Sequence, residues 1–151
     1  MLAKNRSGWT LMEYIDIRED DIDRYPNVTG AYAILRVVDK YVVGYNAWRR
    51  QWEFPAGGIE EGETAREAAL RELYEESHQR SCDLEFKGLF KVEDAKGNMK
   101  YQAVFVGWQN EIVPFVPGEN DEMEKIIIFI CYVARRDISI VKSVQMPGLM
   151  A

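Results

Sequence analysis

The sequence predicts an α+β fold, in which short strands form a mixed sheet and one strong helix packs against it. Short β-rich runs bounded by turn residues lie before and after a single long stretch of good helix formers. The chain has 151 residues, of which 47% are hydrophobic, and this is enough to build one core. Because the sequence shows no linker, repeat or low-complexity stretch, we expect residues 1–151 to form a single domain.

The expected strands follow the chain in order. Residues 9–17 are rich in aromatic and aliphatic side chains and suit a first strand, followed by a polar connector. Two β-rich runs, 31–38 and 41–45, are separated only by Asp39-Lys40, which is typical of a hairpin. A short strand at 52–54 ends at Pro55. After the helix we expect strands over residues 84–92, 101–108 and 125–133, with a turn at 95–98.

The clearest helix begins after Thr64. Thr64 can act as the N-cap, and Glu67 three residues later completes a capping box. Good helix formers then continue to Glu76. On a helical wheel Glu72, Glu75 and Glu76 fall within roughly a third of a turn. They border the apolar flank formed by Ala69, Leu70 and Leu73.

This row of carboxylates has two interpretations. Most acidic helix faces are simply solvated. However, a row that borders the buried side can bind a hard cation such as Mg²⁺ or Mn²⁺, together with substrate phosphates. Arg71 lies one turn from both Glu67 and Glu75 and can brace such a row. Gly57 and Gly58 precede the helix and allow the backbone to approach a ligand closely.

Composition limits the partners. The net charge of −6 disfavours a general nucleic-acid-binding protein, which would present a basic face, but it allows a phosphorylated small molecule held through a metal. The two cysteines, Cys82 and Cys131, form no CxxC motif, so a reducing cytoplasmic compartment is the simpler interpretation. No signal peptide is visible, and the longest apolar run, 126–134, is shorter than the roughly 20 residues that span a membrane.

The acidic row lies inside a known pattern, G-x5-E-x7-R-E-U-x-E-E-x-G-U, where U is an aliphatic residue. The sequence matches it in register at Gly57, Glu63, Arg71, Glu72, Leu73, Glu75 and Glu76. In this segment the chain resembles the Nudix hydrolases. The resemblance implies an α/β/α sandwich around a mixed sheet. It also implies a metal-dependent pyrophosphohydrolase that cleaves a nucleoside diphosphate linked to another group.

The resemblance assigns a role to each matching residue. Glu72, Glu75 and Glu76, with the carbonyl of Ala56, correspond to the ligands of Mg²⁺ or Mn²⁺. Glu72 and Glu75 are also expected to be catalytic, and Arg71 corresponds to the arginine that positions a catalytic glutamate. The remaining matches, Gly57, Glu63 and Leu73, correspond to structural positions.

The family often adds a catalytic acid from a later loop. Glu119, Asp121, Glu122 and Glu124 are available here. The stretch EMEKIIIF is similar to the family's step from acid to strand and points to Glu122. For any one of these acids the alternative is a solvated turn.

The sequence departs from the pattern at two places. His78 stands where the signature has its last glycine, and Gln79 stands where it has an aliphatic residue. We interpret His78 as the C-terminal cap of the helix rather than as a catalytic group, because histidine tolerates positive φ better than most residues. The family's second helix is also expected after residue 129, yet residues 130–151 show no clean helical period. Either a helix around 133–144 or a homodimer partner would cover that face.

The substrate is less well defined by the sequence. Nudix enzymes that cleave ADP-ribose tend to carry a proline where Ala95 stands, whereas WEFPAGGIEEGE is most similar to MutT-like members that hydrolyse nucleoside triphosphates. Trp48, Trp52 and Phe90 are candidates for stacking on the base, with core packing as the alternative. The competing functions are an ADP-ribose or nucleotide-sugar pyrophosphatase, a non-catalytic nucleotide sensor, and an interaction domain with a solvated acidic helix.

Overall fold

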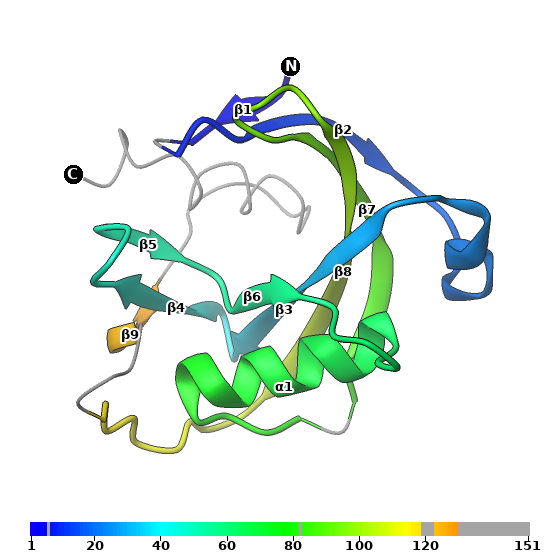
Figure 1. Cartoon of the computed structure of the whole chain (residues 1–151). Coiled ribbons are helices and arrows are strands. Elements are labelled where there is room, and N and C mark those ends of the chain that lie inside the picture. Colours follow the sequence, from blue (N-terminus) through cyan, green and yellow to red (C-terminus); the bar gives the residue numbers. More distant parts are fainter. Residues whose placement is uncertain (6, 82, 119–122, 130–151) are drawn as a thin grey trace.

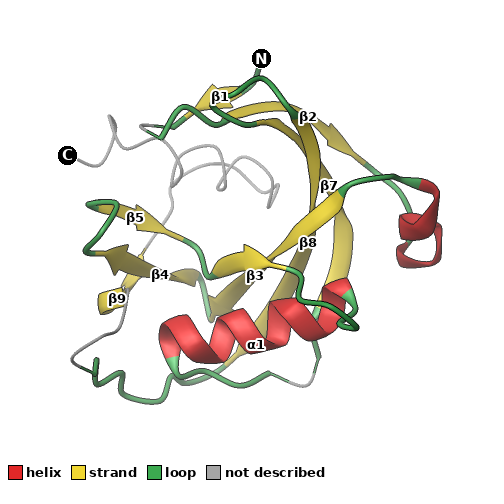
Figure 2. Ribbon diagram, viewed as in Figure 1, coloured by secondary structure: helices red, strands yellow, loops and turns green. Residues whose placement is uncertain are grey.

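The computed structural model describes residues 1–5, 7–81, 83–118 and 123–129, with backbone alone for 124–129. A strongly curled sheet forms most of the molecule, and helix α1 (Ala65–Ser77) packs against its outer face (Figure 1). A short 3-10 helix, η1 (Glu19–Arg24), interrupts the connector between the second and third strands (Figure 2). The predicted α+β class is confirmed.

The sheet contains parallel and antiparallel neighbours and is therefore mixed, as predicted. The main path runs β1-β2-β7-β8-β3-β4-β5, while β6 pairs with β3 and β9 pairs with β4. Only the β3–β8 pair is parallel among the described pairings. The strands are β1 (Ala3–Lys4), β2 (Thr10–Ile15), β3 (Val28–Val37), β4 (Lys40–Asn46), β5 (Gln51–Glu53), β6 (Ala56–Gly58), β7 (Glu85–Glu93), β8 (Met99–Gln109) and β9 (Met123–Phe129).

Strand β3 brings the segment before the helix into the middle of the sheet. One edge of β3 pairs with β8, and the other edge is divided between β6 and β4. The N–H of Ala33 donates to the carbonyl of Pro55 at 2.8 Å, which continues the pairing beyond β6. The sequence did not predict β6, because glycines at 57 and 58 are typical of a break. This pairing holds residues 56–58 directly beside α1.

Alternation along β3 divides the apolar residues between two cores. Ala31, Ala33 and Leu35 face α1, while Ile34 belongs to the core on the opposite, concave face. Side chains alternate between the two faces of a strand, so both faces of this central strand are buried. The core beneath the helix is completed mainly by small and aliphatic helix residues, namely Ala65, Ala68, Ala69 and Leu73.

Several predicted local features are confirmed. The hairpin between 31–38 and 41–45 forms, and Val38 in its turn has φ 60°. The capping box is complete, because Glu67 N–H donates to Thr64 Oγ1 at 3.2 Å and Thr64 N–H donates to the Glu67 carboxylate at 2.7 Å. The end of the last predicted strand and the C-terminal tail lie outside the described residues. Within the described part, no helix is long and apolar enough to cross a membrane.

Candidate active site

Two carboxylates of α1 lie against β6. The Glu76 carboxylate accepts a hydrogen bond from the backbone N–H of Ala56 at 2.9 Å. The Glu72 carboxylate lies so close to Gly57 that a Cβ at that position would overlap it. Glu72 and Glu76 are both nearly buried, with 9% and 7% of their surfaces exposed. Three of the predicted positions, Ala56, Glu72 and Glu76, are therefore brought together where the helix meets the sheet.

Glu75 has a different environment. Its side chain is 55% exposed and its carboxylate lies 3.2 Å from the Arg71 guanidinium, one helical turn earlier. Glu72 and Glu76 thus form the nearly buried part of the row, and Glu75 forms its exposed edge. Such a row can meet a ligand that approaches from solvent.

Arg71 connects the row to the loop that precedes the helix. It donates to the Glu63 carboxylate at 2.7 Å, to Glu72 at 2.5 Å and to the carbonyl of Gly58 at 2.8 Å. The hydrogen bond to Glu63 is the main reason why the pKa of Arg71 lies above its ordinary value. The same bond, with the N–H of Glu60, holds the pKa of Glu63 below its ordinary value.

These contacts place Arg71 between the loop that carries Glu63 and the helix that carries Glu72. Of the two acids expected to contact Arg71, Glu75 does so, whereas Glu67 completes the capping box at the helix start. Glu63 joins the loop to the helix through Arg71. The guanidinium holds the Glu72 carboxylate from one side, so it can fix the orientation of that group.

The donor chemistry at β6 suits a hard divalent cation. Mg²⁺ and Mn²⁺ prefer oxygen ligands, and three carboxylates on one face of the helix supply such oxygens. Gly57 leaves room for the Glu72 carboxylate beside the backbone. Within the described residues no group of three or more acidic, histidine or cysteine side chains already stands in metal-binding geometry. Glu72 and Glu75 are held by Arg71 and Glu76 by Ala56, so these side chains would have to reorient to share an ion.

The end of the helix explains both departures from the motif. His78 adopts φ 59° and ψ 15°, and its N–H donates to the carbonyl of Tyr74 at 2.8 Å, which confirms its interpretation as a C-terminal cap. Gln79 is fully buried, and its side-chain amide hydrogen-bonds the N–H and the carbonyl of Val113 at 2.8 and 2.6 Å. A polar residue at 79 therefore attaches the segment after β8 to the end of the helix.

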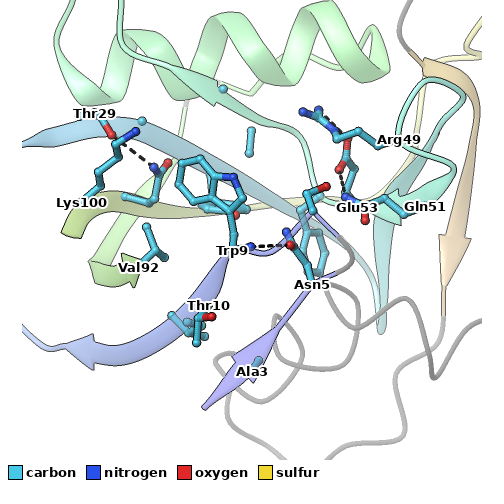
Figure 3. A pocket seen from close by; sticks show the side chains of 18 of the residues that line it. Ala3, Asn5, Trp9, Thr10, Thr29, Arg49, Gln51, Glu53, Val92 and Lys100 are labelled. Atoms are coloured by element: carbon cyan, nitrogen blue, oxygen red, sulfur yellow. Dashed lines mark hydrogen bonds and ion pairs between the residues drawn. The ribbon is translucent and has the colours of Figure 1, made fainter. Parts of the chain in front are cut away.

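A cavity of about 410 Å³ lies on the concave face of the sheet, opposite α1 (Figure 3). Ala56, Gly57 and Gly58 form part of its wall, and the carboxylates of Glu72 and Glu76 lie next to this same segment. The cavity volume falls within the range of roughly 300–1,000 Å³ that is usual for small-molecule sites. One strand therefore separates the carboxylate row from a pocket of ligand size.

The three aromatic residues predicted to bind the base do not line this cavity in the described part of the chain. Phe90 is 1% exposed and packs edge-on against Tyr14 and Tyr32, which is the core packing that the sequence left open as the alternative. Trp52 packs edge-on against Tyr45, with ring centroids 5.2 Å apart. Trp48 lies in a turn after β4 and is 71% exposed.

Three aromatic residues of the described part line the cavity, namely Trp9, Tyr32 and Phe54. Phe54 is 1% exposed and Tyr32 packs edge-on against Phe90, whereas Trp9 is a residue that sequence reasoning assigned only to a strand. No periodic signal could have revealed it, because the wall is assembled from strands that are distant along the chain. Glu122, the predicted late-loop acid, lies outside the described residues, and so do Glu119 and Asp121. The side chain of Glu124 is likewise not described.

A family comparison decides the classification. The family model of the NUDIX domain matches residues 30–138, well over half of the chain. The chain belongs to the Nudix family. The predicted resemblance is thereby confirmed, and Nudix proteins generally use divalent metal ions.

Curated relatives match only part of this Nudix chain. The RNA pyrophosphohydrolase of Bartonella bacilliformis is 61% identical over 89 aligned residues, which cover 48% of this chain and 52% of the relative. The RNA pyrophosphohydrolase of Francisella philomiragia is 42% identical over 55 residues, or 36% of each chain. The alignments therefore span about half the length of these relatives or less. Relatives with this name give no support to the predicted exclusion of polymeric nucleic acid.

Solved structures share the fold. The pyrophosphohydrolase BsRppH of Bacillus subtilis superposes with a TM-score of 0.64 and 22% identity, covering 97% of this chain and 85% of the other. A Nudix hydrolase of Nitrosomonas europaea gives a TM-score of 0.61 and 22% identity, covering 83% and 84%. The Nudix domain of Shewanella oneidensis NrtR, crystallised with ADP ribose, gives 0.58 and 14% identity, covering 76% and 83%. These similarities confirm the Nudix architecture.

Proposed function

We propose that this protein is a metal-dependent Nudix pyrophosphohydrolase that cleaves a phosphoanhydride bond of a nucleoside triphosphate, as MutT-like members do. One observation carries the proposal. The nearly buried carboxylates of Glu72 and Glu76 are held against β6, and β6 also forms the wall of a nucleotide-sized cavity. In this proposal the phosphates of a nucleotide bound in that cavity extend past the edge of β6 to the carboxylate row.

In this proposal Glu72, Glu75, Glu76 and the carbonyl of Ala56 hold the cation, with Mg²⁺ expected first and Mn²⁺ as the alternative. The ion supplies positive charge that neutralises the phosphate oxygens. Arg71 acts as a positioning residue, because it holds both the loop and the Glu72 carboxylate. Glu72 orients a water molecule and accepts its proton while the water oxygen bonds to one phosphorus. The bond from that phosphorus to the bridging oxygen breaks, and the bridging oxygen leaves with the other phosphate.

A second candidate substrate is the 5′-triphosphate end of RNA. The names of the partial relatives favour it. The reacting group is the same triphosphate, so the carboxylate row and Arg71 keep their proposed roles. The two substrates are separated by comparing kcat/KM for free nucleoside triphosphates with kcat/KM for a short RNA that carries a 5′-triphosphate.

The proposal is tested by measuring phosphate and pyrophosphate release from nucleoside triphosphates, 5′-triphosphate RNA, ADP-ribose and dinucleoside polyphosphates, with Mg²⁺ and then with Mn²⁺. We expect Glu76→Gln to lower kcat by about a hundredfold or more, since it removes a negatively charged ligand of the proposed cation, which would neutralise the reacting phosphates. Glu61→Gln is the matched control, because it removes one carboxylate charge from an exposed loop position. Equal turnover by both variants would disprove the proposed site. Metal-dependent binding without any turnover would indicate the sensor function instead.

A further inference from the structure

We propose that Trp9 is the residue on which the nucleobase of the substrate stacks, inside the cavity on the concave face. This inference rests on the proposed function and deepens it. Trp9 lines the cavity, and Figure 3 shows its indole ring in the middle of the lining side chains. A rigid aromatic face in a pocket is the usual partner of a base, because every base has a π-face.

The position of Trp9 is held by a compact turn between β1 and β2. Its N–H donates to Asn5 Oδ1 at 2.9 Å, and its carbonyl accepts from the Asn5 N–H at 2.9 Å. Gly8 closes the turn with φ 83°, and its N–H donates to the carbonyl of Asn5 at 3.2 Å. These bonds fix the backbone that carries the indole before a ligand arrives, which lowers the entropic cost of binding.

The charge around the ring suits an anionic ligand. The Lys100 ammonium lies 5.1 Å from the Trp9 ring centroid, while Asp94 holds it at 3.1 Å. Among the charged residues of the lining, Arg49 is paired with Glu53 at 2.9 Å, and Lys4 and Lys100 are the other two cations. In a protein of net charge −6, these two ammonium groups favour a phosphorylated ligand over a neutral one.

A polar group suited to a base edge lies on the neighbouring strands. The Gln102 side chain lies over Gly30, where a Cβ would overlap its Oε1, and its Nε2 lies 3.4 Å from Thr29 Oγ1. An amide carries both a donor and an acceptor, as the edges of bases do. The same cavity is bounded by residues 56–58, so a nucleotide stacked on Trp9 can direct its phosphates toward the carboxylate row.

The Trp9 wall lies outside the part of the chain that matches the family. The family model begins at residue 30, whereas Asn5, Trp9 and Thr29 precede it. The segment that matches the family thus supplies the wall at β6, and the N-terminal hairpin supplies Trp9. We therefore assign base recognition to a feature outside the segment that the family model matches.

The test compares ligands with and without a base. Affinities for a non-hydrolysable nucleoside triphosphate analogue and for inorganic tripolyphosphate are measured by calorimetry on the full chain with Mg²⁺. We expect Trp9→Leu, which keeps an apolar side chain, to weaken nucleotide binding about 5- to 100-fold. Tripolyphosphate binding should change less than about twofold, because it has no base to stack. Trp9→Phe should restore most of the nucleotide affinity, and Trp108→Leu is the matched control at an exposed tryptophan that does not line the cavity.

Each outcome has a defined meaning. Equal nucleotide affinity in the wild type and Trp9→Leu would overturn the inference and leave the hydrolase proposal standing. Equal weakening of nucleotide and tripolyphosphate would also overturn it, because Trp9 would then support the pocket as a whole. Nucleotide binding that is sensitive to Trp9 but never followed by turnover would support the inference and overturn the hydrolase proposal. Absence of any nucleotide binding by the wild type would overturn both.

Discussion

The Ala56 N–H donates to the Glu76 carboxylate at 2.9 Å, so a strand that precedes the helix holds a side chain of its last turn. A charge-assisted hydrogen bond of this kind fixes both groups. It brings together the backbone segment 56–58 and the most buried carboxylate of the row. The other helix carboxylate that lies against this strand, Glu72, depends instead on the absence of a side chain at Gly57.

Gly57→Ala should therefore disturb the site without disrupting the fold. The new methyl group would overlap the Glu72 carboxylate and displace it. We expect kcat/KM to fall by about a hundredfold, since displacements near 1 Å have effects of that size. Gly58→Ala is the control, because the nearest atom to its added Cβ is the Thr29 carbonyl oxygen at 3.8 Å. Similar kinetics for the two variants would contradict this account of Glu72.

Arg71→Lys tests the role of the planar guanidinium. Lysine keeps the charge but cannot reach Glu63, Glu72 and the Gly58 carbonyl together. We expect the free energy of unfolding to fall by about 1–3 kcal/mol, as for lost hydrogen bonds to charged groups. Denaturant unfolding measures this change. Arg18→Lys, at a side chain that is 84% exposed, should have little effect, and an equal loss there would refute the argument.

Gln79→Ala should loosen the segment after β8. It removes both hydrogen bonds to Val113, and it leaves the N–H and the carbonyl of that residue without this partner. We expect a loss of about 1–3 kcal/mol in the free energy of unfolding. Hydrogen exchange at the Val113 amide should become faster. Gln109→Ala, which removes an exposed bond to the Arg80 carbonyl, should change stability less. Unchanged exchange at Val113 would show that Gln79 does not anchor this segment.

The turn between β7 and β8 should make stability depend on pH. Hydrogen bonds from Asn98 are the main reason why the pKa of Asp94 lies far below its ordinary value. The unfolded chain binds the proton at higher pH than the folded chain, so this contribution is present above the ordinary aspartate pKa. It is lost as pH falls through the lowered pKa of the folded state. The difference in unfolding free energy between wild type and Asp94→Asn should therefore shrink as the solution is acidified from neutral pH toward that lowered pKa. A difference that grows on acidification would reverse the assignment.

Features of the helix were predictable because they depend on near neighbours in the chain. The capping box of Thr64 and Glu67 involves residues three apart, and the row of Glu72, Glu75 and Glu76 follows from the period of the helix. His78 closes the helix through its own backbone conformation. The Nudix motif covers this same local segment, so the spacing of its residues is sufficient to indicate the family.

The pocket and the environment of each acid depended on tertiary structure. Glycines at 57 and 58 suggested a break, yet pairing with β3 makes residues 56–58 a strand, and only that pairing brings Ala56 to Glu76. Phe90 lies at a strand position that suits either core or surface, and the curled sheet buries it. The sequence by itself determined the helix, its carboxylate row and the family, since these follow from local spacing. Tertiary structure alone placed Trp9 in the cavity, because that wall joins strands far apart in the chain.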